Sequence, residues 1–293
     1  MFHLDPEYAN PTGTTVVASG ANGNIANHIV DQLVKTGYSW LVGYSSQLYG
    51  PGKIELAEVR NMAESCAFDE AVKGASGFIH MATPVMETAD PNIAIPVVVN
   101  GTLNAHFVLT SSSGACTDAK PGKVFTIDSN TWKEEAEAAA WAHPPRKRSV
   151  EVGSRKQAKF HLQHVLPNAN FGSVLDKHHQ NGFDGEETLG NLPPQYLINS
   201  MDDAIVCVAT LLYKDVSKER IFTFAYSYNW NDILAIFREL CPGRQLIDDI
   251  PNLQRDLSVV TNGRAEDLLK PFVGHEWTSL EETVKSSVAD SQV

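Results

Sequence analysis

The chain lacks the sequence features of several classes of protein. It has no apolar run near the roughly 20 residues of a membrane span. Its first residues, MFHLDPEYAN, have neither the basic start nor the apolar stretch of a secretory signal. Its four cysteines are far apart and form no Cys-x-x-Cys pair. A net charge of -12 disfavours nucleic acid as a partner, because phosphate contacts require clustered lysine and arginine. We therefore expect a reduced, cytoplasmic protein without membrane or nucleic-acid contacts.

Metal-ligand spacings are also missing. His161 and His164 are spaced for one face of a helix, and His178 and His179 lie nearby. No cysteine or carboxylate stands at ligand spacing beside them, so surface histidines are the better interpretation and we expect no bound metal.

The apolar pattern of the first half changes repeatedly between a period of two and a period near 3.6. Apolar and β-branched runs predict strands at 14–19, 40–44, 54–59, 77–82 and 107–110, and helical stripes predict helices at 25–34, 68–72 and 92–105. Strands that alternate with helices predict a parallel sheet with helices on both faces. The predicted fold is therefore α/β, with a doubly wound parallel sheet of the Rossmann type.

The pattern loosens beyond residue 165. Helices are predicted at 201–212 and 231–240, a strand at 220–225, and a capping box at Thr278–Glu281 that opens the last helix. We predict one domain at 12–165 and a smaller α/β lobe at 166–293.

A glycine turn joins the first predicted strand to the first predicted helix. Gly20 permits a sharp turn, Gly23 lets the backbone approach a pyrophosphate, and Ala26 is small enough for the helix to pack closely on the strand. The free N–H groups at the helix N-terminus then face the phosphates. A dinucleotide is the expected ligand, and a glycine turn without any ligand is the alternative.

The residues that choose between NAD and NADP are missing. An acid about 20 residues beyond the turn would bind the ribose 2′-hydroxyl, and an arginine would bind a 2′-phosphate. The end of the second predicted strand reads VGYSS (42–46), and Lys53 is the nearest cation. Both cofactors therefore stay open.

Long stretches of the chain resemble the extended short-chain dehydrogenase/reductases of the NAD-dependent epimerase/dehydratase superfamily. The resemblance is strongest to the dihydroflavonol-reductase-like branch, with its fungal NADPH-dependent aldehyde and ketone reductases. The stretches are SGANGNIANHIVDQL (19–33), FDEAVKGASGFIHMATPV (68–85), NGTLNA (100–105), VLTSSSGA (108–115), VFTIDSNTW (124–132), VLPNANFG (165–172) and YNWNDILAIFREL (228–240). The resemblance implies hydride transfer from NADP or NAD to a small-molecule carbonyl substrate.

The resemblance also implies roles for particular residues. Ser112, with Ser113 as the alternative register, would hold the carbonyl oxygen of the substrate. The positions that match the family's cofactor contacts are Gly20, Asn22, Gly23, Asn24, Ile25, Asn61, Ala82, Thr83 and Pro84. Asn61 is either a contact near the adenine or simply a turn residue. The 12–165 domain would then bind the dinucleotide, and the 166–293 lobe the substrate.

The catalytic pair of the family is absent. Its tyrosine donates a proton and its lysine, four residues later, binds the nicotinamide ribose. Alignment of GSRKQA (153–158) places Glu151 and Arg155 at these positions. A free glutamate has a pKa of about 4.3, against about 10 for tyrosine, and an arginine one helical turn later keeps it ionised. Arg155 stays a predicted cofactor contact, whereas Glu151 is a poor proton donor.

Two crossovers are shorter than in the resembled family. Only His106 separates NGTLNA from FVLT, and the stretch that leads from QAK to VLPNANFG is also short. Each lacks about a dozen residues, or roughly 18 Å of helix at ~1.5 Å per residue. Both belong to the face that forms the family dimer, so we expect a monomer. A splicing artefact or a decaying paralogue would give the same pattern.

Three functions are consistent with these residues. The first is an NAD(P)H-dependent aldehyde or ketone reductase by lineage, impaired by loss of the tyrosine and lysine. The second is a catalytically inactive nucleotide-binding homologue. The third is reuse of the fold for non-redox chemistry, such as isomerisation or cyclisation in secondary metabolism. The missing pair is the feature that separates the first function from the second.

Overall fold

The computed structural model describes residues 8–21, 23–41, 54–55, 57–82, 108–134, 163–175 and 193–289, together with the single residues 90, 92, 97 and 100. Within these ranges no helix has the length and apolar character needed to cross a membrane.

A seven-stranded sheet runs through the described part of the chain. It is formed by β1 (Thr15–Ser19), β2 (Ser39–Leu41), β3 (Ile54–Glu55), β4 (Ala75–His80), β5 (Val108–Thr110), β7 (Gln163–Pro167) and β10 (Arg220–Thr223). The strand order is β10-β7-β5-β4-β1-β2-β3, and every neighbouring pair is parallel. The order reverses between β1 and β4, where doubly wound folds bind their ligands. The predicted Rossmann-type α/β fold is confirmed.

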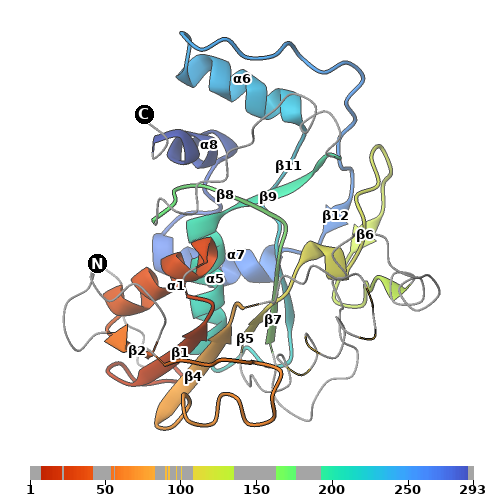
Figure 1. The fold of residues 1–293 in the computed structure, drawn as a ribbon. Coiled ribbons are helices and arrows are strands. Elements are labelled where there is room, and N and C mark those ends of the chain that lie inside the picture. The colour runs from red at the N-terminus through yellow and green to blue at the C-terminus, as the bar shows by residue number, and fades with distance from the viewer. Residues whose placement is uncertain are drawn as a thin grey trace.

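Three helices cover one face of this sheet (Figure 1): α1 (Asn24–Lys35), α5 (Ser200–Leu212) and α7 (Gly263–Val273). The central helix, α5, is apolar nearly all round and buried along almost its whole length, as expected for a helix enclosed by other elements. It contacts α1, α7, β4, β5 and β7. The stripe of Ile29, Val30 and Leu33 buries α1 against it.

The other face of the sheet is covered, in the described residues, by two irregular segments. Phe68 of the 57–74 segment packs on Phe78 and Val17. Further along, Cys116 and Ile127 pack on Leu166 and Phe222. The second segment contains the short helix η1 (Ser113–Ala115) and β6 (Thr126–Ile127), which pairs with β12 (Val259–Val260).

A second layer of structure lies beyond the carboxyl ends of the strands. Its sheet has the order β11-β9-β8, formed by β8 (Ala169–Phe171), β9 (Gln195–Asn199) and β11 (Tyr226–Tyr228). The helices α6 (Trp230–Leu240) and α8 (Leu280–Ala289) lie over it (Figure 1). Trp230 is buried against Tyr228 and Phe171.

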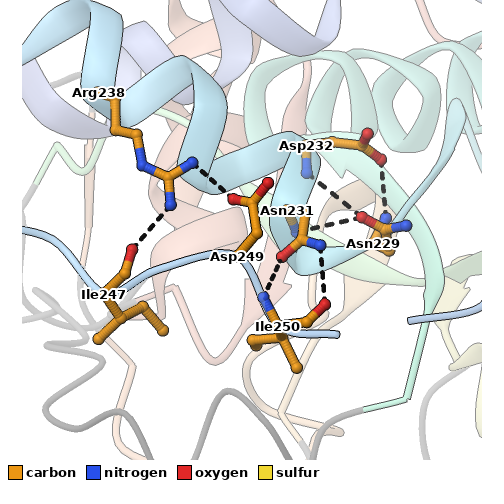
Figure 2. Close-up of polar contacts among 7 residues, drawn as sticks. All are labelled: Asn229, Asn231, Asp232, Arg238, Ile247, Asp249 and Ile250. Atoms are coloured by element: carbon orange, nitrogen blue, oxygen red, sulfur yellow. Dashed lines mark hydrogen bonds and ion pairs between the residues drawn. The ribbon is translucent and has the colours of Figure 1, made fainter. Parts of the chain in front are cut away.

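Polar side chains of α6 hold the chain that follows the helix (Figure 2). The Asn231 amide donates to the Ile250 carbonyl at 3.0 Å and accepts from its N–H at 2.9 Å. Arg238 donates to the Ile247 carbonyl and pairs with Asp249. A capping box of Asn229 and Asp232 closes the N-terminus of α6. These contacts fix an irregular segment that has few strand or helix hydrogen bonds of its own.

Several predicted boundaries are corrected by the structure. The helix expected at 68–72 is a series of turns with a single helical bond, from the Val72 N–H to the Phe68 carbonyl. One turn is too short to offset the cost of helix nucleation. The strand expected at 54–59 ends at Glu55, because this edge strand pairs with β2 at only two positions.

Two further corrections come from tertiary contacts. The strand predicted in the smaller lobe at 220–225 is β10, which pairs with β7 in the main sheet. The predicted boundary between the two domains, at residue 165, falls inside β7. The division of the chain into two domains stays a prediction. The cap of α8 is Ser279 with Glu282, one residue later than predicted. Thr278 instead donates its N–H and its hydroxyl to the carboxylate of Asp202 on α5.

The contacts of Asn231 predict a measurable effect on stability. Asn231→Ala leaves the backbone N–H and carbonyl of Ile250 without these partners, so the free energy of unfolding should fall by about 1–3 kcal/mol. Urea denaturation monitored by circular dichroism measures this change. The control is Arg60→Ala, which removes an exposed ion pair with Glu58 and should change nothing measurable. Equal effects of the two substitutions would contradict the assigned role of Asn231.

Candidate functional site

The candidate site begins where β1 ends. Gly20 has a φ of +71°, in the left-handed region that glycine adopts without strain. The Gly23 N–H donates to the Gly20 carbonyl at 2.8 Å and closes the turn, and α1 starts at Asn24. Gly23 provides no side-chain cap, and the first turn of α1 contains no acidic residue. The helix therefore presents its positive N-terminal end at the carboxyl edge of the sheet.

The turn after β1 forms one side of the site, and the backbone of Ala82, which follows β4, forms the other side. A Cβ built on Gly20 would lie 2.9 Å from the Ala82 nitrogen and 3.0 Å from its Cα, closer than real Cβ atoms come. A Cβ on Gly23 would lie 3.2 Å from the Gly20 carbonyl oxygen. The absence of a side chain on Gly20 thus lets the backbone of Ala82 approach the turn, and its absence on Gly23 lets the turn close on itself. Such a glycine cradle is suited to a ligand bound through backbone N–H groups.

A partly buried hydrogen bond joins the last residue of β1 to the last residue of β4, next to Gly20 and Ala82. Ser19 Oγ lies 2.7 Å from Nδ1 of His80, which is 3% exposed. The rings of Phe68 and Phe78 lie beside the imidazole, with centroids 6.0 and 6.1 Å away. Burial lowers the pKa of His80 from 6.5 to about 4, so the imidazole is neutral at physiological pH.

Ser112 lies at the carboxyl end of β5, the strand next to β4. Its hydroxyl oxygen accepts the Gly114 N–H at 3.1 Å and caps the short helix η1. The hydroxyl hydrogen is not used in this bond and can be donated. Because all strands of the sheet are parallel, Ser112 occupies the same edge as Gly20 and Ala82.

The other predicted contact residues lie in different surroundings, and their roles stay predictions. Nδ2 of Asn24 contacts Ser200 Oγ at 3.4 Å, and its buried Oδ1 has no hydrogen-bond partner in the described structure. Ile25 packs against the main core. Asn61 is exposed, and its side chain forms a turn with the Ala63 N–H and the Glu64 carboxylate, which is the alternative given above. Predicted residues outside the described ranges are Asn22, Thr83, Pro84, Glu151 and Arg155. Their roles stay predictions.

The prediction of a surface position for His164 is wrong. It lies in β7 rather than on a helix, and is only 4% exposed because β5 and β10 flank the strand. Burial and the charge of Arg220 lower its pKa to about 4. His161, His178 and His179 fall outside the described ranges. In the part of the chain that is described, no three potential ligands gather as a metal site would require.

The thiol of Cys116 is buried and has a charged neighbour. Nη2 of Arg220 donates to Sγ at 3.1 Å, and the guanidinium stacks on Trp132 with its carbon 3.8 Å from the ring centroid. Burial raises the pKa of the thiol, and Arg220 opposes this only in part. A neutral, buried thiol is a poor nucleophile, so Cys116 has a structural role.

Sequence reasoning missed Ser19 and His80 as site residues. Both are polar residues that end apolar strands, in TVVAS and GFIH. The carboxyl ends of parallel strands are where doubly wound folds place their ligands. Polarity at that position was the available signal.

Comparisons with known proteins agree with this geometry. No family model matches the chain. Aldehyde reductase 2 of Sporidiobolus salmonicolor is 29% identical, with 95% of this chain and 96% of the relative covered. Ketoreductase adrE of Penicillium roqueforti is 31% identical, with 96% and 98% covered. Among solved structures, yeast methylglyoxal/isovaleraldehyde reductase Gre2 with NADPH has a TM-score of 0.67 at 23% identity, with 94% and 98% covered, which supports the fold.

The fold and the glycine cradle define a dinucleotide-binding type of α/β protein. With relatives above 30% identity over nearly their whole length, the chain belongs to the extended short-chain dehydrogenase/reductases. Within them it resembles fungal aldehyde reductases and ketoreductases.

The cradle predicts an unequal cost for two glycine substitutions. Gly20→Ala and Gly37→Ala both place a Cβ on a left-handed residue, at φ +71° and +90°, which costs about 1–2 kcal/mol. Only Gly20→Ala also collides with Ala82, since none of the residues that the structure describes lies within 4 Å of a Cβ on Gly37. We expect Gly20→Ala to lower the free energy of unfolding by about 1–3 kcal/mol more than Gly37→Ala. Urea denaturation of the two variants measures both free energies of unfolding. Equal losses of stability would show that Gly20→Ala does not collide with Ala82.

The low pKa of His80 predicts loss of stability in acid. Between pH 6.5 and about 4 the unfolded chain binds a proton that folded His80 excludes, so stability is complete above pH 6.5 and falls as the pH decreases. The loss from this residue should be on the order of 3 kcal/mol. Urea denaturation from pH 4 to 7 should show a flatter pH dependence for His80→Gln. His275→Gln, at an exposed histidine, is the control. Parallel profiles for wild type and His80→Gln would contradict the prediction.

Proposed function

We propose that this protein binds NADP or NAD between β1 and β4 and reduces an aldehyde or ketone. The observation that carries the proposal is the Gly20–Gly23 turn, seated against Ala82 at the point where the strand order reverses. A dinucleotide needs a turn with glycines where the backbone comes close to the phosphates, next to a helix N-terminus, and Gly20, Gly23 and the start of α1 meet this need. The buried Oδ1 of Asn24, which has no hydrogen-bond partner among the described residues, adds an acceptor at the start of the helix.

The relatives support the proposed chemistry. Three that match over nearly the whole chain are named as an aldehyde reductase and as ketoreductases. When bound, a reduced nicotinamide supplies a hydride. In this chain the Ser112 hydroxyl, at the end of β5, would donate a hydrogen bond to the substrate carbonyl oxygen and polarise it. The cradle would hold the phosphates through backbone N–H groups.

The proposed turnover is slow, because Glu151 and Arg155 stand where the family has tyrosine and lysine. Loss of a positioned general acid typically lowers the rate by about 10²–10⁴. With Glu151 ionised, the proton for the product alcohol would come from solvent. Arg155 would keep a positive charge near the nicotinamide ribose without the geometry of a lysine amine.

The same substitutions favour a second candidate, a nucleotide-binding protein without turnover. A third, non-redox chemistry on a bound dinucleotide, draws support from a relative named NAD-dependent epimerase/dehydratase terH of Aspergillus terreus, at 25% identity. For all three candidates the layer of β8, β9, β11, α6 and α8 is the proposed substrate lobe. A monomeric state and a cytoplasmic location belong to the proposal as well.

A binding titration and an activity assay distinguish these candidates. NADPH and NADH are titrated by cofactor fluorescence, and cofactor oxidation is followed with a panel of aldehydes and ketones. Binding with slow oxidation is the expected result. Binding with no oxidation would exclude the reductase and favour the second or third candidate. Failure to bind either cofactor would overturn the cofactor proposal itself.

Restoring the family pair should restore turnover. The double variant Glu151→Tyr/Arg155→Lys regains a phenol that can donate a proton and an amine that can lower its pKa, so kcat should rise by about 10²-fold or more. Steady-state assays at saturating cofactor measure the change. The matched control is Glu151→Phe/Arg155→Lys, which lacks only the phenolic hydroxyl and should show no gain. Equal rates in the two variants would show that the rest of the site does not position the phenol.

A further inference from the structure

The hydroxyl of Ser19 connects three groups at the edge of the crevice. Its oxygen lies 2.7 Å from Nδ1 of His80, 3.3 Å from the Met81 nitrogen and 3.4 Å from the Ala82 nitrogen. A backbone bond from the Met81 N–H to the Ser19 carbonyl, at 3.2 Å, runs parallel to these contacts. The end of β1 therefore holds the chain that leaves β4 through one side chain as well as through the backbone.

The directions of these bonds follow from the chemistry of the groups. The N–H groups of Met81 and Ala82 can only donate, so the Ser19 oxygen accepts from both. Its own hydrogen is then free to be donated to Nδ1 of His80, which must be unprotonated. The imidazole is thereby held as the neutral tautomer with its hydrogen on Nε2. The flanking rings of Phe68 and Phe78 hold it in place.

The position of Ala82 has little tolerance. Its nitrogen lies where even one methyl group on Gly20 would collide with it, so a shift of Ala82 changes the width of the cradle directly. Backbone groups that bind phosphate must be placed to within about 0.5 Å. Ser19 contacts the Ala82 nitrogen directly, and His80 contacts Ser19. The two side chains therefore act on the position of Ala82 through this chain of hydrogen bonds.

We propose that Ser19 and His80 are a positioning pair that holds Met81–Ala82 against the Gly20 turn, and thereby sets the affinity for the phosphate and adenosine-ribose end of the dinucleotide. This inference rests on the proposed cofactor site and names residues that tune it. The pair acts through the backbone of Ala82 rather than through a contact of its own with the cofactor.

The test compares variants that break the bond with one that removes a histidine elsewhere. Dissociation constants for NADPH and for ADP-ribose are measured by titration calorimetry at 15 °C with Ser19→Ala, His80→Gln and the double variant. Each single variant should bind both ligands about tenfold more weakly, as expected when a buried hydrogen bond loses one partner. The double variant should bind each ligand no more weakly than the single variant with the lower affinity, because each single substitution already removes the same hydrogen bond.

His164→Gln is the matched control. His164 is as buried as His80 and has a similarly lowered pKa, but it lies in β7, two strands away from β4. It should lose stability and keep wild-type affinity. Ser19→Thr keeps the hydroxyl and should restore binding relative to Ser19→Ala. Should His80→Gln fail to fold, Ser19→Ala, which removes a single oxygen atom, decides the test with Ser19→Thr.

Three results would overturn the pairing. Wild-type affinity in Ser19→Ala and His80→Gln would show that the bond does not set the cradle, and would leave the proposed function intact. An equal loss in His164→Gln would show general loosening of the fold. A loss for NADPH without a loss for ADP-ribose would place the effect at the nicotinamide end. If the wild-type protein binds neither ligand, the proposed function fails and the positioning role fails with it.

Discussion

The contact between the backbones of Gly20 and Ala82 is the constraint on which the arrangement of the site depends. It joins the two strands between which the order of the sheet reverses, and it leaves no space for a side chain on Gly20. Closure of the turn by the Gly23 N–H places the start of α1 directly behind it. The close approach of Ala82 therefore limits the width of the crevice, and the closed turn sets where α1 begins.

The core is organised to keep this edge of the sheet in place. The helix α5 lies against α1 and three strands of the sheet and is buried almost throughout, so small shifts would disturb many packed side chains. Its first turn also carries buried polar contacts. Asp203 accepts a hydrogen bond from Thr223 at the end of β10, and Asp202 accepts two from Thr278. Burial raises the pKa of Asp203 to about 7. The polar groups at the strand ends thus connect the main sheet to the layer that contains α8.

Local sequence signals located most elements whose hydrogen bonds are made within a short stretch of chain. The turn at Gly20 and the helices α1, α5 and α6 depend on neighbouring residues, so their periodicity and punctuation were sufficient. Which strands pair was harder to predict from the sequence, because the pairing of β10 with β7 joins residues more than 50 positions apart. The cap of α8 was displaced by one residue since Asp202, far away in sequence, binds Thr278.

The sequence by itself determined the α/β class, the glycine turn and the family, whereas the placement of Glu151 and Arg155 at the family's tyrosine and lysine positions stays a prediction. Each of these depends on residue identity and on spacing within one segment. Only the tertiary structure showed that His80 and His164 are buried and neutral, that Ser19 joins β1 to the end of β4, and that Ala82 abuts Gly20. Burial and close approach arise from strands and helices brought together from distant parts of the chain, and no local pattern encodes those distances.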